Sequence, residues 1–113
     1  MSNKTFINYY IFNENVVPMK YDCISYKAKL SLSNFKYGND NKALLIENLI
    51  TNKHFRNKGY ATKLLNYVIS NYGNSYSIYL MVLKSNKYAI NFYKKRGFLF
   101  VNKFKNTYIC KLN

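Results

Sequence analysis

The hydrophobic period of the chain changes twice in its central part. Residues 43–51 (ALLIENLIT) are almost continuously apolar, which indicates a strand buried on both faces. Residues 57–72 then place apolar side chains at helical spacing, and Gly73 follows where a helix C-cap is expected. Residues 77–83 (SIYLMVL) form a second continuous apolar run. This alternation predicts a βαβ unit with a right-handed crossover and two parallel strands.

The segment before this unit has the pattern of a β-meander. Residues 5–12 are rich in aromatic and β-branched side chains, and residues 21–32 alternate in part between apolar and polar positions. A break at residues 13–19, which contains Pro18, separates the two runs. Glycine with asparagine and aspartate at residues 36–42 predicts a tight turn. The N-terminal third is therefore expected to be β-structure.

A second helix is predicted at about residues 86–96. Ser85 or Asn86 can serve as its N-cap, and Gly97 is expected to end it. The three cations at residues 94–96 lie at the negative end of the helix dipole, which suits a solvated helix end.

Two short strand-like runs close the chain, at residues 98–103 and 107–112, and they predict a hairpin. At 113 residues the chain has the size of one domain, covering residues 1–113. The expected fold is α/β, of the α+β kind, with a mixed central sheet of six to seven strands. The predicted order of elements is β-β-β-α-β-α-β-β.

Charge is the strongest compositional feature, because eighteen Lys and Arg residues face four acids, for a formal net charge of +14. Such a charge attracts nucleic acid, an acidic membrane surface or a phosphate-bearing cofactor. The alternative is a composition bias, since the chain is rich in Asn, Lys, Ile and Tyr. Nucleic acid is the less favoured partner, because almost all cations are lysines spread along the whole chain.

Several other classes are disfavoured by what the sequence lacks. The two cysteines are far apart without metal-ligand spacing, so no metal site is expected. No apolar run approaches the roughly 20 residues that span a bilayer, and the N-terminus lacks the pattern of a signal peptide. We therefore expect an intracellular, cytoplasmic protein outside the membrane.

The junction between the first central strand and its helix carries the pattern R-x-x-G-x-A, formed by Arg56, Gly59 and Ala61. Glycine lets the backbone turn sharply and approach a ligand closely. The free N–H groups of a first helical turn and the helix dipole together favour an anion such as a pyrophosphate. Arg56 and Lys58 add full positive charges. A single glycine before a helix is also common in ordinary packing turns.

A second motif lies in residues 85–98 (SNKYAINFYKKRGF). Its key positions are Asn86, Ala89, Tyr93, Gly97 and Phe98. With the strand, the R-x-x-G-x-A loop and the helix before it, this block resembles the GNAT superfamily of acetyl-CoA-dependent N-acetyltransferases. The two motifs cover residues 43–100. The resemblance implies a GNAT-like fold, but the chain has no room for the helices that usually follow the first strand.

The resemblance implies acetyl-CoA as co-substrate. The backbone of Leu49, Ile50 and Thr51 would pair with the pantetheine arm, and Asn86 would hold the cofactor near its reactive end. The pyrophosphate would lie among Arg56, Asn57, Lys58, Gly59, Tyr60, Ala61 and Thr62.

The same resemblance assigns catalytic roles to two residues. Tyr93 would be the general acid that protonates the departing thiolate, and Glu47 would be the general base if burial raises its pKa toward neutrality. For Tyr93 the alternative is one more core aromatic, and for Glu47 a paired or exposed strand residue. His54 is a further candidate base, although a surface histidine is the commoner case. The implied reaction is direct attack of a primary amine in a ternary complex.

The acceptor is less well defined by sequence. The phrase INFYKKRG, and Glu47 nine residues before Arg56, resemble the diamine (spermidine/spermine) N-acetyltransferases. Four acids offer little surface to a cationic acceptor, which favours a neutral or anionic small amine or a protein amine. The missing helices predict an acceptor side that is shallow, open, or completed by a homodimer. The alternative function is a non-catalytic module of the same fold that binds CoA or nucleic acid through its basic surface.

Overall fold

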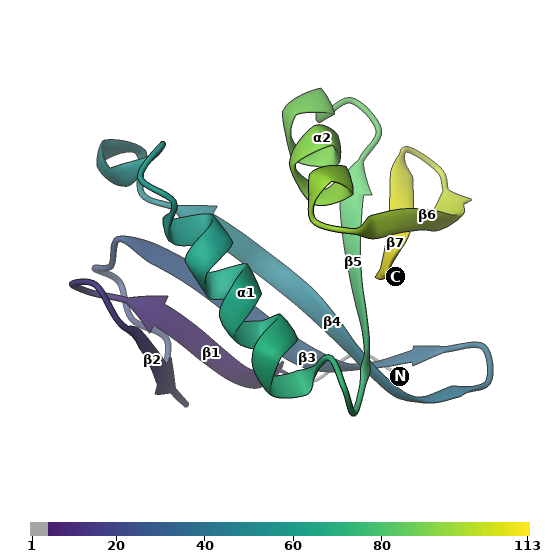
Figure 1. Ribbon diagram of the computed structural model, residues 1–113, viewed down its shortest axis with the longest axis horizontal. Helices are drawn as coiled ribbons and strands as arrows, with labels where there is room; N and C mark the ends of the chain where they lie inside the picture. The colour runs from purple at the N-terminus through teal and green to yellow at the C-terminus, as the bar shows by residue number, and fades with distance from the viewer. Residues whose placement is uncertain (1–4) are drawn as a thin grey trace.

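A computed structural model, which describes residues 5–113, shows one seven-stranded mixed sheet with two α-helices (Figure 1). The strands lie in the order β2-β1-β3-β4-β5-β7-β6, and only β4 and β5 pair in parallel. The elements are β1 (Thr5–Ile11), β2 (Val16–Met19), β3 (Ala28–Tyr37), β4 (Asp40–Thr51), the 3-10 helix η1 (Lys53–Phe55), α1 (Tyr60–Tyr72), β5 (Ser77–Leu83), α2 (Lys87–Lys95), β6 (Phe98–Phe104) and β7 (Thr107–Leu112). The predicted βαβ unit is confirmed as β4-α1-β5.

Both helices pack on one face of the sheet. Figure 1 shows α1 crossing β1, β3 and β4, while α2 lies beside the upper part of β5. The predicted apolar stripe of α1 supplies the buried residues Leu64, Leu65 and Val68, and α2 buries Ile90. These side chains join one core cluster with Leu30, Leu32, Leu44, Ile46, Ile78, Leu80 and Phe98. Burial of this apolar area is the main force that holds the helices to the sheet.

The N-terminal prediction was wrong in detail. The strand expected at residues 21–32 begins only at Ala28, and the break at residues 13–19 contains the short strand β2. β2 tolerates Pro18 because it is an edge strand, where a missing N–H breaks no ladder bond on its open side. The loop between β2 and β3 is held to β1 by a hydrogen bond from the Cys23 N–H to the Tyr10 hydroxyl, 2.8 Å long. The prediction that no helix fits between the first strands is confirmed.

The second helix follows the prediction more closely. Asn86 is its N-cap, and the Asn86 side-chain oxygen accepts a hydrogen bond from the Ala89 N–H at 3.1 Å. Gly97 adopts φ 94°, a left-handed conformation that ends the helix and starts β6. Within residues 5–113 neither α1 nor α2 combines the length and the apolar character needed to cross a membrane.

Candidate active site

The parallel strands β4 and β5 separate part of the way along their length. Their pairing runs from Ala43 with Ser77 to Ile46 with Leu80 and then stops. Beyond that point β4 stays paired with β3, and β5 stays paired with β7. The strands therefore open a V-shaped gap that lies directly above the buried core.

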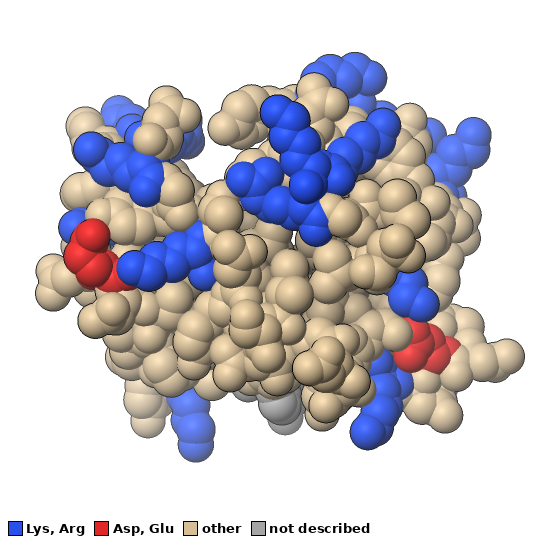
Figure 2. Space-filling model, in the orientation of Figure 1, with Lys and Arg blue, Asp and Glu red and all other residues tan. Residues whose placement is uncertain are grey.

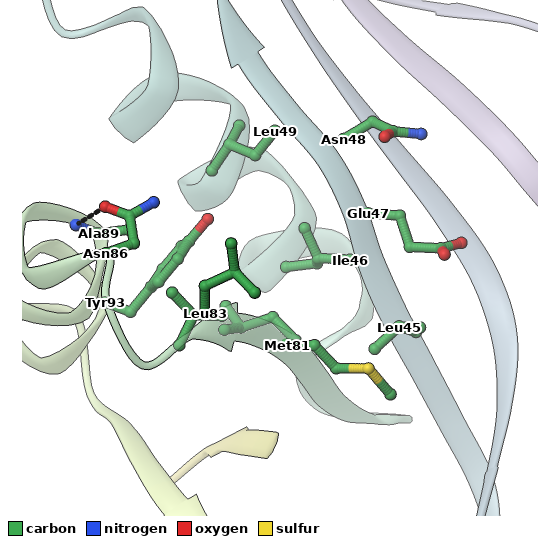
Figure 3. Close-up of a pocket in the computed structure, with 12 residues that line it drawn as sticks. Leu45, Ile46, Glu47, Asn48, Leu49, Met81, Leu83, Asn86, Ala89 and Tyr93 are labelled. Carbon is green, nitrogen blue, oxygen red and sulfur yellow. Dashed lines mark hydrogen bonds between the residues drawn. The ribbon is translucent and has the colours of Figure 1, made fainter. Parts of the chain in front are cut away.

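A cleft of about 400 Å³ occupies this gap, and we call it the inner cleft (Figure 3). It is lined by Leu45, Ile46, Glu47, Asn48, Leu49, Leu80, Met81, Val82, Leu83, Asn86, Ala89 and Tyr93. Strand β4 forms one wall, β5 forms another, and the start of α2 closes the top. Since β4 has no strand partner on this side, the backbone groups of that edge are available to a ligand.

A β-bulge in β4 determines which side chains reach the cleft. The two-residue step from Lys29 to Ser31 lies opposite the three-residue step from Ile50 to Glu47, so β4 carries one extra residue. Asn48 takes φ 54°, a left-handed conformation that asparagine tolerates better than most residues. As a result Leu49 packs against the core, and Asn48 is exposed next to the exposed Glu47. Sequence reasoning missed the bulge, although two adjacent polar residues inside an apolar run are a signal for one.

A second, larger hollow of about 1080 Å³ opens from the inner cleft, and we call it the outer groove. Figure 2 shows it as a notch between the part of the molecule over the start of α1 and the part over α2. The sequence-predicted residues that line it are Leu49, Ile50, Thr51, Arg56, Asn57, Gly59, Tyr60, Ala61, Thr62, Asn86 and Tyr93. The structure therefore brings together all the predicted site residues except Lys58 and Glu47. Lys58 is exposed in the same loop, and Glu47 lines the inner cleft but not the outer groove.

The start of α1 faces the outer groove without a side-chain cap. The helix was predicted from residue 57 but begins at Tyr60, because Asn57 with φ 63° and Gly59 with φ 81° cannot belong to a right-handed helix. Gly59 is the N-cap, and a Cβ built there meets no atom within 4 Å. The first N–H groups of α1 therefore stay open to an anion.

The two arginines differ in exposure, and Arg56 is the exposed one. Its Nε lies 3.5 Å from the Thr51 carbonyl oxygen at the end of β4, so the side chain folds back along the groove. Arg96, predicted as part of a solvated helix end, is instead half-buried. Its Nη2 donates to the Thr62 hydroxyl at 2.8 Å, and its guanidinium carbon lies 3.6 Å from the centre of the Phe92 ring.

Sequence reasoning also missed the wall that α2 contributes to the outer groove. Tyr88, Phe92 and Lys95 line it, at positions i, i+4 and i+7 of one helix face. That spacing was present in the sequence, but nothing local showed which face of α2 would meet α1.

Tyr93 lies where both hollows meet. Its half-buried ring packs edge-on against Phe98 and Phe92, with ring centres 5.8 Å and 5.4 Å away. In Figure 3 the hydroxyl points between Leu49 and Asn86, at the mouth of the inner cleft. Burial raises the pKa of the Tyr93 hydroxyl, so the group keeps its proton at neutral pH.

Glu47 differs from the expectation. Its side chain is exposed rather than buried, because it follows Ile46 in the strand alternation and points to the helix-free face. The Ser33 hydroxyl donates to its Oε1 at 2.6 Å. In Figure 3 the carboxylate points away from Tyr93 and toward β3. His54 is exposed in η1 and lines neither hollow.

A polar cluster ties the loop after β1 to the start of α1. The Tyr60 hydroxyl donates to Glu14 Oε2 at 2.7 Å, and Lys27 Nζ lies 3.6 Å from the same oxygen. Lys27 Nζ also sits over the rings of Phe55 and Tyr60, at 5.2 Å and 5.5 Å from their centres. The hydrogen bond from Tyr60, followed by the nearby charge of Lys27, lowers the pKa of Glu14. The cluster holds the first residue of α1 in place.

The chain is thus an α+β protein with a cleft between two diverging parallel strands. A family model described as the acetyltransferase (GNAT) family matches residues 21–98. The chain belongs to this family, a family of acyltransferases that use acetyl-CoA as co-substrate. No curated protein sequence matches the chain.

Solved structures agree with this fold. The chain is similar to the PH1933 protein of Pyrococcus horikoshii, with TM-score 0.69 and 23% identity over 85% of this chain and 62% of that one. It is similar to Arabidopsis thaliana NAA60, solved in complex with acetyl-CoA, with TM-score 0.62 and 18% identity over 76% of this chain and 64% of that one. A putative GNAT acetyltransferase from Bacteroides thetaiotaomicron gives TM-score 0.60 and 20% identity over 83% and 58%. The chain thus spans about three fifths of the length of these proteins.

Replacing Tyr60 with phenylalanine should raise the pKa of Glu14 toward its usual range, because the hydroxyl is the largest cause of its lowering. A carboxyl ¹³C NMR titration measures this pKa. Because the pKa is lower in the folded chain, the contact stabilises the fold at neutral pH, and its contribution disappears as the pH falls through that pKa. Tyr88→Phe, at an exposed side chain of α2, serves as the control and should leave the pKa of Glu14 unchanged. An equal effect of both variants on this pKa would contradict the assignment.

Proposed function

We propose that the protein transfers the acetyl group of acetyl-CoA to a primary amine by direct attack in a ternary complex. The observation that carries the proposal is that the two hollows share Leu49, Asn86, Ala89 and Tyr93, so that the start of α1, the free edge of β4 and Tyr93 line adjoining space. Acyl transfer from a long phosphate-bearing thioester needs these three elements in this order.

The proposed cofactor position follows the outer groove. The pyrophosphate lies on the uncapped first turn of α1, with Arg56 and Lys58 beside it and Gly59 leaving room for close approach. The pantetheine arm pairs with the free edge of β4 at residues 49–51. Since the Asn86 side-chain oxygen is occupied by the Ala89 N–H, its amide nitrogen is left to donate to the cofactor near the reactive end.

The proposed chemistry takes place in the inner cleft. An amine must lose a proton to attack the thioester, and Glu47 takes that proton through a water, because its carboxylate is exposed beside the cleft rather than aimed into it. Backbone N–H groups on the free edge of β4 stabilise the developing oxyanion. Tyr93 protonates the thiolate that leaves, for which its retained proton suits it.

The proposed acceptor is a small-molecule or protein amine. The resemblance of INFYKKRG to diamine acetyltransferases suggests a diamine. A diamine would bring two positive charges to a cleft whose lining contains one acid, Glu47. We therefore favour an acceptor with one reacting amine and no further cation. Within residues 5–113 no helix covers the face of β1 and β3 opposite α1, so a second copy of the chain is the alternative source of an acceptor wall.

An acetyl-CoA-dependent thiol-release screen across amine classes tests the acceptor. CoA binding without thiol release from any amine would instead favour the non-catalytic module. Figure 2 shows the main observation for that alternative, a group of basic side chains over α2.

Gly59→Val should weaken acetyl-CoA binding at least about tenfold, because the new side chain points into the space assigned to the pyrophosphate. Titration calorimetry measures the affinity. Gly38→Val is the matched control, since Gly38 also has a positive φ and open space around it but lies in the β3–β4 turn. Both variants carry a similar backbone strain of about 1–2 kcal/mol. Equal affinity of the Gly59 variant and the wild type would contradict the assigned cofactor position.

Tyr93→Phe should lower kcat roughly 100-fold, the usual contribution of a general acid, and leave the dissociation constant of acetyl-CoA within about threefold. A thiol-release assay and calorimetry measure the two quantities. The control is Tyr108→Phe, which removes a hydroxyl from a tyrosine stacked on Phe100 in the terminal hairpin. Unchanged turnover would return Tyr93 to a packing role.

Glu47→Gln should lower kcat roughly 100-fold at neutral pH, because the amide cannot accept the amine proton. The change keeps the size of the side chain and its bond from Ser33. Asp40→Asn, at the other end of β4, makes the same change in net charge and should be active. A Glu47→Gln enzyme as fast as the wild type would leave Glu47 as an ordinary exposed strand residue.

A further inference from the structure

Arg96 follows the last residue of α2 and reaches across to α1. Its Nη1 donates to the Phe92 carbonyl at 2.9 Å, and its Nη2 donates to the Thr62 hydroxyl at 2.8 Å. The guanidinium stacks on the Phe92 ring, 3.6 Å from its centre. These contacts fix a planar cation in the wall of the outer groove, between the two helices.

This cation has no carboxylate partner among residues 5–113, although all four acids of the chain lie in that range. Each acid accepts a hydrogen bond from another residue: Glu14 from Tyr60 at the start of α1, Asp22 from Asn8, Asp40 from Tyr79 and Glu47 from Ser33. In addition, the Arg96 Nε is buried and has no hydrogen-bond partner in this part of the chain. A partly buried charge without a counter-ion is unfavourable, so the groove suits an anion that residues 5–113 do not supply.

The position of the cation indicates which anion this is. Thr62 is the third residue of α1, so the guanidinium lies at the same first turn whose N–H groups lack a cap. Two sources of positive potential therefore converge there, one from the helix start and one from the arginine. Arginine suits this place better than lysine, because its planar fork can hold Thr62 and Phe92 and still offer donors to phosphate oxygens.

We propose that Arg96 is a ligand of the acetyl-CoA pyrophosphate. The pyrophosphate is then the counter-ion that Arg96 lacks in the protein itself. The proposal rests on the cofactor position given above. It assigns the pyrophosphate, rather than the 3′-phosphate of CoA, because the Arg96 contact is with the first turn of α1.

Titration calorimetry with CoA, dephospho-CoA and pantetheine tests the assignment. Arg96→Gln should weaken CoA and dephospho-CoA by the same factor, roughly 10-fold to 100-fold, and leave pantetheine unchanged because it carries no phosphate. A loss restricted to CoA would make the 3′-phosphate the partner and overturn the proposal. Equal weakening of all three ligands would show that Arg96 only holds the helices together, which would also overturn it.

Lys94→Gln is the matched control, because it removes one charge from the same helix end while its ammonium lies over the Phe100 ring, 4.8 Å from the centre. It should bind all three ligands as the wild type does. If the wild type binds none of them, the cofactor position itself fails. If the wild type binds and Arg96→Gln binds equally well, only the role of Arg96 fails.

A second measurement is made on the unaltered protein and uses a variant only to assign its signals. Arg56 and Arg96 are the two arginines of the chain, so its ¹H–¹⁵N spectrum contains two Nε–Hε signals, which Arg56→Lys assigns. The Arg96 signal should shift on addition of dephospho-CoA and stay in place with pantetheine. An Arg96 signal whose chemical shift does not change at saturating dephospho-CoA would overturn the proposal.

Discussion

The divergence of two parallel strands is the feature on which the rest of this protein depends. β4 and β5 pair up to Ile46 and Leu80 and then follow different neighbours. Each strand keeps its ladder bonds on one side and leaves polar backbone groups on the other, above a core that α1 and α2 complete. Unpaired backbone groups beside an apolar core are stable when a ligand or water can reach them. The gap is therefore a candidate binding site that the sheet creates through its backbone alone.

The large positive charge acquires a more specific meaning in this setting. The chain has four acids, and each accepts a hydrogen bond from another residue. Glu14 does so at the start of α1, and the other three do so outside the outer groove. Arg56, Lys58 and Arg96 have no carboxylate partner in residues 5–113, so this side of the outer groove carries positive charge that suits a phosphate. On the face shown in Figure 2 the basic side chains lie in several separate groups, and for the remaining lysines a bias in composition is a sufficient explanation.

Local patterns predicted the elements well where one periodicity dominated. The stripe of α1, the Asn86 cap of α2 and the apolar runs of β4 and β5 all appear as expected. Prediction was poorer where a partner strand sets the structure. β2 holds a proline because it lies at an edge, and residues 20–27 form a loop because β1 pairs with β3 only from Ala28 onward. Neither fact is visible in a short window of sequence.

By itself the sequence determined the βαβ unit, the glycine turn before α1 and the position of Tyr93 in the helix that Asn86 caps. Each of these depends on contacts only a few residues apart. Tertiary structure alone decided how these parts meet. The bulge at Asn48 turned Leu49 inward, and the contact of Arg96 with Thr62 placed the guanidinium between α2 and α1. Such outcomes depend on register and on which helix face meets a neighbour. Both are set by contacts between residues far apart in the chain, which no local pattern records.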